Sequence, residues 1–273
     1  MVNIGFWNVR GMNSRTKQFE INRMISKNNV GLFGLLETRI KSSKMHNNVF
    51  TMDGKWSVVR NYSQHGGGRI WVLWDSKTFE VDVLNIYTQC IHVKVKDKGR
   101  HQNFWLTIVY GPNKAKEREE LWQQIRQLKI RVSGAWCLMD DFNAISNLNE
   151  RFGANVVSNA EIKPMGEMIE DCESDAIKAQ RAFFTCNHKQ AVEHIVYSRI
   201  DRVFINEEWL NQAPWSYAHF MPEGLYDHCP CIIRFDEEIS RRTEAFKYFN
   251  MWKLDENFEN VIGKVWKQEL EGN

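Results

Sequence analysis

Short apolar segments that run into a polar or charged residue recur along the chain and constrain its fold more than any other feature. The stretches Val2–Val9, Val30–Leu36 and Trp136–Met139 are examples. Their length and their β-branched and aromatic content predict buried strands rather than helices. No apolar run reaches the roughly 20 residues that a membrane-spanning helix needs, so we expect no membrane association.

Amphipathic stretches alternate with these strands. The segment Lys114–Val132 carries apolar residues at i, i+4 and i+7 from Leu121, which predicts a helix with one buried face. Another helix is expected from Ser158 to about Glu173, because a Glu three residues after that Ser makes a capping box. A third is expected over Thr16–Asn28. The mixture of β–α–β and β–β connections predicts an α/β fold with mixed sheets.

The same reasoning predicts further strands and a domain boundary. We expect strands at Arg69–Trp74, Glu80–Tyr87, Cys90–Lys96, Asn103–Tyr110, Ala182–Thr185, Arg199–Ile205, Trp215–Phe220 and Cys231–Phe235. A charged run follows the last of these strands. We therefore expect one domain over residues 1–236, followed by a charged linker and a C-terminal helical tail over residues 237–273.

Composition excludes some classes of protein. With 16 Phe, 7 Tyr and 11 Trp, the chain is too aromatic for a disordered protein. The first residues lack the basic region and apolar core of a secretion signal. We therefore expect a nuclear or cytoplasmic protein in which all 6 cysteines are reduced thiols. We also expect a monomer.

Charge is unevenly distributed although the net charge is only +2. Residues 1–118 hold 19 basic and 8 acidic side chains, whereas residues 119–273 hold 17 and 26. Such asymmetry is typical of a surface that meets a polyanion beside a region rich in carboxylates. If the two halves interleave in the fold, however, the charges mix and the asymmetry has no such meaning.

Polar side chains gather at the ends of the predicted strands. They are Asn8, Glu37, Tyr110, Asp141, Asn143, Asp201, Asp227 and His228. Each residue alone is more often a turn former or a packing residue. Together they supply carboxylates, amides, one phenol and one imidazole, with no Ser or Cys nucleophile recognisable beside a base. That set suits metal-assisted phosphodiester hydrolysis, because hard carboxylate oxygens are the ligands that Mg²⁺ prefers.

Six motifs in order resemble the endonuclease/exonuclease/phosphatase superfamily. They are NVRG (8–11), LLETR (35–39), VYGPN (109–113), DDFNAI (140–145), SRIDR (198–202) and DHCP (227–230). The stretches GRIWVLWD, EIKP, VFINEEWL and PEGLYDHCP are most similar to the endonuclease domain of plant LINE retrotransposons. The resemblance implies a four-layer α/β sandwich, in which two mixed sheets pack face to face with helices outside.

The resemblance also implies a Mg²⁺-dependent endonuclease that hydrolyses DNA phosphodiester bonds without a covalent intermediate. It assigns Glu37 as the main ligand of Mg²⁺, with Asn8 beside it and Asp227 nearby. Mn²⁺ would serve as an alternative metal. DNA is the expected partner.

The remaining strand-end residues receive catalytic roles from the same resemblance. Asp141 would orient or deprotonate the attacking water, and Asn143 would help to place it. Tyr110 would contact the scissile phosphate or the leaving oxygen. His228 would contact the phosphate and pair with Asp201.

Basic residues supply the expected contacts with DNA. Arg10 stands where the abasic-site branch of the superfamily has Asp, as in LINE-type sequences, which argues against a repair enzyme. Lys94, Lys96, Lys98 and Arg100 are expected near a hairpin tip that touches DNA phosphates. A merely solvated turn is an equally good interpretation of this run.

Two departures from the family pattern leave alternatives open. Asp140 replaces a Gly, and we expect its carboxylate either to repel the phosphate or to raise the pKa of Asp141 by like-charge interaction, unless it points harmlessly into solvent. The segment Phe184–Asn187 is one residue shorter than its family counterpart and lacks a Trp, which puts the packing near Asp201 in doubt. A catalytically impaired relative that retains the fold and weak DNA binding is therefore one alternative, and a phosphatase of the same superfamily is another.

Overall fold

The computed structural model describes residues 2–44, 56–67, 69–153, 157–188 and 196–235. The predicted boundary near residue 236 and the predicted tail over residues 237–273 lie outside the described residues. Within the described ranges, no helix is long and apolar enough to cross a lipid bilayer.

Three sheets and four helices are described. Sheet A has the order β11 (Ala179–Arg181), β15 (Ser216–Phe220), β16 (Cys231–Phe235), β1 (Asn3–Asn8), β2 (Val30–Leu36), β4 (Ile70–Asp75) and β3 (Trp56–Arg60). Sheet B has the order β10 (Ser174–Ala176), β14 (Asp201–Asn206), β8 (Trp136–Asp141), β7 (Gln102–Tyr110), β6 (Cys90–Asp97) and β5 (Phe79–Ile86). Sheet C comprises β12 (Cys186–His188), β13 (Val196–Ser198) and β9 (Arg151–Phe152). The helices are α1 (Arg15–Lys27), α2 (Ala115–Lys129), α3 (Asn159–Asp171) and α4 (Glu207–Gln212).

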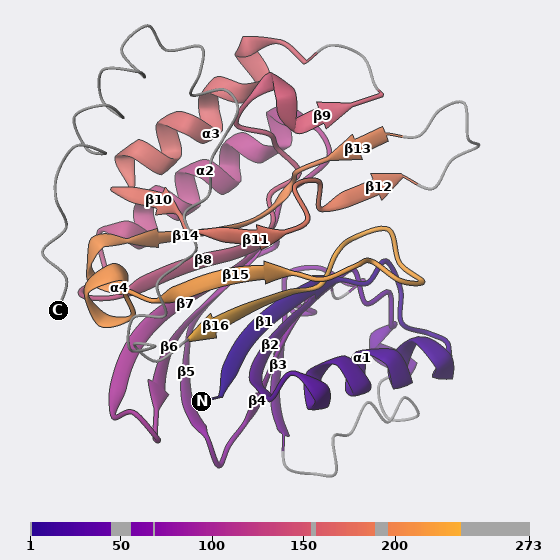
Figure 1. The fold of residues 1–273 in the computed structure, drawn as a ribbon, viewed down its shortest axis with the longest axis vertical. Helices are drawn as coiled ribbons and strands as arrows, with labels where there is room; N and C mark the ends of the chain where they lie inside the picture. The colour runs from indigo at the N-terminus through magenta and orange to yellow at the C-terminus, as the bar shows by residue number, and fades with distance from the viewer. Residues whose placement is uncertain (1, 45–55, 68, 154–156, 189–195, 236–273) are drawn as a thin grey trace, which may run out of the picture. The chain divides into compact units, whose positions relative to one another are not determined.

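Sheets A and B pack face to face, and helices cover their outer faces (Figure 1). Alternate residues of β1 and β2, such as Phe6 and Leu32, meet Leu106 and Met139 of sheet B in the central core. The intervening side chains of sheet A pack against α1, and those of sheet B pack against α2 and α3. This alternation follows from the period of two along a strand. The predicted four-layer α/β sandwich with two mixed sheets is confirmed.

The topology brings distant strand ends to one edge of the sandwich. β1 and β2 are parallel, with Asn8 paired to Leu36, so Glu37 follows directly beside Asn8. β7 and β8 are parallel in sheet B, with Tyr110 paired to Asp141. β14 is antiparallel to β8 and therefore starts at the same edge. Parallel pairing thus places the ends of four strands where α/β proteins gather their ligand sites.

One predicted strand is wrong. Ala182–Thr185 is irregular, and a strand begins only at Cys186. The Thr185 hydroxyl accepts hydrogen bonds from the backbone N–H groups of Ile200 and Asp201, and its own backbone N–H donates to the Ser198 carbonyl, so a side chain and isolated backbone bonds together anchor this segment. Cys186 then pairs with Ser198, which keeps the shortened segment beside the SRIDR motif. Helix α4 and strands β3, β9, β10, β11, β12 and β13 were not predicted from the sequence.

Candidate active site

An amide bridge joins the two sheets at the shared edge. The side-chain amide of Asn8 donates to Asp141 Oδ2 at 2.9 Å and to Glu37 Oε1 at 3.2 Å. Its oxygen accepts from the backbone N–H of Arg10 at 3.1 Å. Asn8 is fully buried, so this geometry is fixed by its surroundings. At the end of β1, the Asn8 side-chain nitrogen therefore links Glu37 of sheet A to Asp141 of sheet B.

Glu37 is an ionised carboxylate held by arginines. Arg39 Nη2 lies 2.8 Å from Glu37 Oε2, and Arg10 Nε lies 3.8 Å from Oε1. Burial raises the pKa of Glu37, but hydrogen bonds from Arg39 and Asn8 and the nearby positive charges outweigh it and lower that pKa overall. Arg10 also pairs with Asp227 at 2.5 Å. Two carboxylates thus share the Arg10 guanidinium.

Asp141 lies in the middle of a hydrogen-bond cluster at the end of β8. The backbone N–H of Asn143 donates to its Oδ1 at 2.8 Å, and the Asn143 amide donates to Oδ2 at 3.2 Å. The same amide reaches the Gly111 carbonyl at 2.7 Å, which fixes the loop after β7. Burial, followed by the charge of Asp201, raises the pKa of Asp141 above its usual range. A carboxyl whose pKa is raised in this way is suited to accept a proton near neutral pH.

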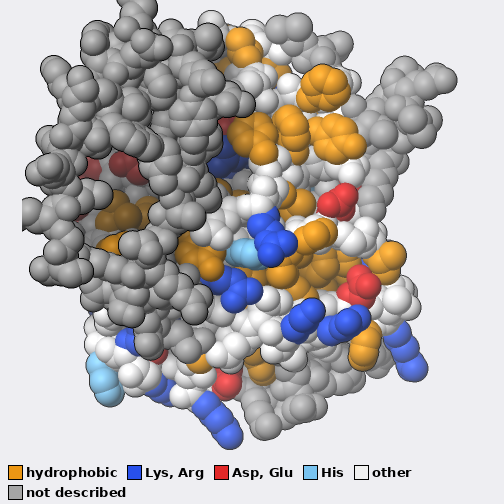
Figure 2. Space-filling view, in the orientation of Figure 1, with side chains coloured by type: hydrophobic (Ala, Val, Ile, Leu, Met, Phe, Trp, Pro, Cys, Tyr) orange, Lys and Arg blue, Asp and Glu red, His pale blue; other side chains and the backbone are white. Residues whose placement is uncertain are grey.

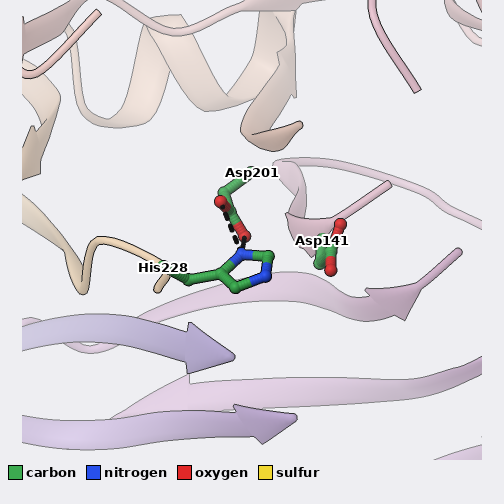
Figure 3. Close-up of side chains that lie close together, drawn as sticks. All are labelled: Asp141, Asp201 and His228. Carbon is green, nitrogen blue, oxygen red and sulfur yellow. Dashed lines mark hydrogen bonds and ion pairs between the residues drawn. The ribbon is translucent and has the colours of Figure 1, made fainter. Parts of the chain in front are cut away.

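His228 is fully buried between carboxylates and a thiol. Its Nδ1 lies 3.0 Å from both oxygens of Asp201, and its Nε2 lies 3.4 Å from Cys186 Sγ. Figure 3 shows the ring beside Asp201, with its other nitrogen turned towards Asp141. Burial lowers the pKa of His228, but the charge of Asp201 outweighs this effect and raises it well above the usual value. The predicted pair of His228 and Asp201 is therefore present.

Tyr110 ends β7 at the same edge and is 7% exposed. Burial, and then the charges of Glu37 and Asp141, raise the pKa of its hydroxyl well above the usual value. The hydroxyl therefore stays protonated and can act as a hydrogen-bond donor. The guanidinium of Arg69, which is an exposed residue, lies 5.4 Å from the centroid of the Tyr110 ring.

Left-handed backbone is concentrated around this edge. Of the non-glycine residues with positive φ, five belong to the site or adjoin it: Arg10, Glu37, Arg39, Asp140 and Asn143. A side chain in such a conformation costs roughly 1–3 kcal/mol, and structures retain that strain mainly at functional sites. The backbone thus marks the same edge as the side chains do.

Asp140 is fully buried, so the expectation that its carboxylate points into solvent was wrong. In β8, Trp136 and Leu138 face the helices, and simple alternation would turn Asp140 the same way. Its φ of 111° interrupts the pleat and turns the carboxyl inwards. An ideal Cβ built on Gly34 of sheet A would lie 3.1 Å from Asp140 Oδ2. The carboxyl is therefore wedged between the two sheets.

The buried Asp140 carboxyl is almost without polar partners. It is 0% exposed, and neither oxygen forms a hydrogen bond of good geometry, although the backbone N–H of Asp141 lies close by. Burial, then the charges of Asp201 and Asp141, raise its pKa well above the usual value. Burial therefore favours the neutral form of this carboxyl.

The predicted basic hairpin lies at the other end of sheet B. β7 runs for 9 residues from the hairpin to Tyr110, which is roughly 27 Å at the usual rise of a strand. Its cations are engaged within the chain: Lys96 with Glu80, Lys98 with the Ser76 carbonyl, Arg100 with Asp97, and Lys94 with the Trp105 ring. The structure therefore does not bring these four residues to the candidate active site, whereas it does bring Arg10 there.

Three residues of the site were missed. Arg39 and Arg69 lie beside Glu37 and Tyr110, and the motif LLETR contained the first of them. Cys186 lies against His228, although the sequence offered no thiol beside a base. The departure from the family pattern at Phe184–Asn187 was the available signal for Cys186. Its partner His228, however, is 42 residues away in the chain, and only the fold brings the two together.

No family model and no curated protein matches the chain. Solved structures do resemble it. The endonuclease domain of TRAS1, a telomere-specific non-LTR retrotransposon, has a TM-score of 0.64 at 13% identity, covering 87% of this chain and 100% of that chain. The 3′ phosphatase NExo from Neisseria, bound to a product DNA hairpin, has a TM-score of 0.65 at 15% identity and the same coverage. An AP endonuclease from Archaeoglobus fulgidus has a TM-score of 0.65 at 13% identity, again with 87% and 100% covered. At these identities the likeness shows the fold alone.

Proposed function

We propose that this chain, which has the fold of the endonuclease/exonuclease/phosphatase superfamily, is a metal-dependent endonuclease of the LINE retroelement type that hydrolyses DNA. One observation carries the proposal: the Asn8 amide bonds both Glu37 and Asp141. It places a carboxylate that attracts a cation beside a carboxyl whose pKa is raised towards neutrality. Phosphodiester hydrolysis needs both groups at one phosphate.

The residues fit a hard divalent cation. Glu37 is ionised and its side chain is 14% exposed, and Asp227 shares Arg10 with it as a counter-ion. Carboxylate oxygens are the donors that Mg²⁺ and Mn²⁺ favour. Glu37 and Asp227 would bind the ion with the carboxylate oxygens that now contact the guanidiniums of Arg10 and Arg39. Bound there, the metal would neutralise charge that develops on the phosphoryl oxygens.

The chain's own side chains supply the remaining chemistry. Asp141, held by Asn8 and Asn143, accepts a proton from water and orients it towards the phosphorus. The protonated Tyr110 hydroxyl donates to the phosphate or to the leaving oxygen. The charge of Asp201 raises the pKa of His228 and so favours its cationic form, which would contribute positive potential from beneath the site.

DNA fits the rim of the site. Arg39 is 59% exposed, Arg69 is exposed over Tyr110, and guanidiniums bind backbone phosphates. Phe152 of sheet C, 68% exposed, and Phe183, 46% exposed in the segment before β12, offer faces for base stacking. Figure 2 shows hydrophobic side chains gathered over the region of sheet C, with Lys and Arg side chains lower on the same face.

The salt dependence of DNA binding separates the two candidate contact surfaces. We expect the double variant Arg39→Gln, Arg69→Gln to flatten the slope of log K against log salt by about 1.8, because each lost phosphate contact removes about 0.9. The matched control Lys94→Gln, Lys96→Gln removes the same charge from the distant hairpin and should leave the slope unchanged. Fluorescence anisotropy in EDTA measures binding without cleavage. A flattened slope in the control alone would mean that DNA contacts the hairpin and not Arg39 and Arg69.

The rate of nicking should depend on pH through Asp141. Its pKa is raised by burial and by Asp201, so the basic form is lost as pH falls at values well above the ordinary Asp pKa of about 3.9. We expect the single-turnover rate to fall about tenfold per pH unit below that raised pKa. A rate–pH profile measured at saturating Mg²⁺ tests this. A profile that stays flat down to pH 5 would remove Asp141 from the role of base.

A plasmid-nicking assay with Mg²⁺, and with EDTA as control, tests the function itself. A catalytically impaired relative is the second candidate, because the Nε2 of His228 faces Cys186 rather than an open surface and Asp140 is buried without good partners. Binding of DNA without nicking at any Mg²⁺ or Mn²⁺ concentration would favour that candidate. Release of phosphate from a 3′-phosphorylated oligonucleotide, without nicking, would instead favour a phosphatase.

A further inference from the structure

Helix α1 presents a row of cations around an exposed aromatic ring. Arg15, Phe19, Arg23 and Lys27 follow one another at intervals of four residues, so they form one row along the helix surface at steps of roughly 6 Å. All four residues are exposed, and Phe19 is 67% exposed. Figure 2 shows Lys and Arg side chains in a row over α1, with hydrophobic side chains beside them. We call this row the α1 ridge.

The charge of the α1 ridge is not neutralised by the part of the chain that the structure describes. Within that part, none of its three cations forms a salt bridge with a carboxylate. The acidic residue of α1, Glu20, acts on another group: burial, and then the charge of Glu20, raise the pKa of Tyr226. A row of cations without carboxylate partners attracts a polyanion.

A second cluster of cations and rings adjoins the C-terminal end of the α1 ridge. Arg234 Nη2 donates to Oδ1 of Asn28, the residue that caps α1, at 2.9 Å. Arg234 pairs across the sheet with Tyr217, whose ring centroid lies 6.5 Å from that of His219. Burial, and then the charges of Arg234 and Arg181, lower the pKa of His219, so both guanidiniums lie near its ring. We call Arg181, Tyr217, His219 and Arg234 the β15 patch.

The β15 patch lies apart from the candidate active site. Ala218 packs in the core between the two sheets, so its neighbours Tyr217 and His219 point to the outer face of sheet A. Arg234 is level with the start of β1, whereas Asn8 ends that strand, roughly 17 Å away at the usual rise of a strand. Figure 2 shows a His side chain on this outer face with Lys or Arg side chains on either side of it. The patch therefore belongs to a different surface from the rim that carries Arg39 and Arg69.

We propose that the α1 ridge and the β15 patch together bind single-stranded nucleic acid. Phe19 and Tyr217 would stack on bases, and Arg23, Lys27 and Arg234 would pair with backbone phosphates. Cations interleaved with aromatic rings are the combination by which proteins bind single strands, and rings on the face of a sheet stack bases in the same way. A single strand is favoured over a duplex, because the bases of a duplex are stacked on one another and present only their edges in the grooves.

Phe19→Ala tests stacking separately from charge. We expect this variant to bind a fluorescent oligothymidylate about tenfold more weakly than the wild-type chain, as measured by anisotropy in EDTA, because stacking on one ring contributes about this factor. An abasic oligomer of the same length offers phosphates but no bases, so it should bind both proteins alike. Phe19→Trp should restore the affinity for oligothymidylate. Ile130→Ala is the matched control, because Ile130 is an apolar residue that is 83% exposed at the end of α2.

The double variant Arg23→Gln, Lys27→Gln tests the phosphate contacts. It should flatten the slope of log K against log salt for oligothymidylate by about 1.4, because each contact with a phosphate of a single strand contributes about 0.7. Lys116→Gln, Arg131→Gln is the matched control, because both residues are exposed cations on or just after α2, and neither is in a salt bridge with a described residue. The control should leave the slope unchanged. Circular dichroism verifies the fold of every variant.

Three outcomes would overturn the proposal. They are a wild-type chain that does not bind oligothymidylate, a Phe19→Ala variant that loses as much affinity for the abasic oligomer as for oligothymidylate, and a slope that the double variant leaves unchanged. None of the substituted residues belongs to the candidate active site. The nicking assay is therefore independent of these measurements, and the hydrolytic function stands or fails separately.

Discussion

Glu37→Gln is expected to remove metal-dependent nicking while the fold is retained. Gln keeps the size of the side chain and one oxygen that can accept from either Asn8 or Arg39, but it loses the negative charge that attracts the cation. Metal stabilisation of a phosphoryl transition state is worth several kcal/mol. At about 1.36 kcal/mol per factor of ten, a loss of about 4 kcal/mol lowers the rate roughly a thousandfold.

Single-turnover nicking of supercoiled plasmid across a Mg²⁺ titration measures this loss, and calorimetry with Mn²⁺ reports on the metal directly. Glu80→Gln is the matched control, because Glu80 is 55% exposed and pairs with Lys96 on the hairpin side of sheet B. The control should nick and bind metal like the wild-type chain. If Glu37→Gln binds Mn²⁺ and nicks as well as the control does, Glu37 is not the metal ligand.

The strand pattern predicted the architecture and much of the site, because both depend on local periodicity. Asn8, Glu37, Tyr110 and Asp141 all follow apolar runs, and parallel pairing of β1 with β2 and of β7 with β8 brings such ends to one edge. Strand and helix bounds for these elements were correct to within a few residues. The spacing of apolar residues predicts which face of a strand or helix is buried, and that spacing is present in the sequence.

What the sequence could not supply depends on dihedral angles and on contacts between distant segments. Alternation along β8 points Asp140 outwards, and only its φ of 111° turns it between the sheets. The apolar character of Ala182–Thr185 favoured a strand. In the structure, however, the Thr185 hydroxyl accepts hydrogen bonds from the backbone N–H groups of Ile200 and Asp201. Similarly, nothing in KVKDKGR indicates at which end of the sheet that hairpin lies.

Asp140→Gly is expected to stabilise the fold. The wild-type residue combines a φ of 111° with a carboxyl that is 0% exposed and lacks good hydrogen bonds. Left-handed backbone costs a side chain roughly 1–2 kcal/mol, and an unsatisfied buried polar group costs roughly 1–3 kcal/mol. Gly gives back about 0.5–1 kcal/mol through its greater freedom in the unfolded chain. We expect a net gain of about 2–3 kcal/mol in the free energy of unfolding at neutral pH.

The gain should increase with pH. The pKa of Asp140 in the folded state is raised, chiefly by burial and then by Asp201 and Asp141, whereas in the unfolded chain it is about 3.9. Between those two pKa values the folded wild-type chain holds a proton that the unfolded chain has released. The stability of the wild-type protein therefore falls by up to about 1.36 kcal/mol per pH unit above about pH 4, and Gly removes this dependence.

Urea unfolding of both proteins at several pH values from 4 to 8 tests the sign as well as the size. Asp140→Asn serves as the control, because it keeps the strained backbone and a buried polar group but cannot ionise. It should lose the pH-dependent part of the difference and retain the penalty of the backbone. Equal unfolding midpoints for the wild-type chain and Asp140→Gly at pH 7 would mean that the carboxyl is accommodated without penalty. A stability difference that shrinks as pH rises would mean that the buried group is ionised, and the inter-sheet position of Asp140 would then require a compensating cation.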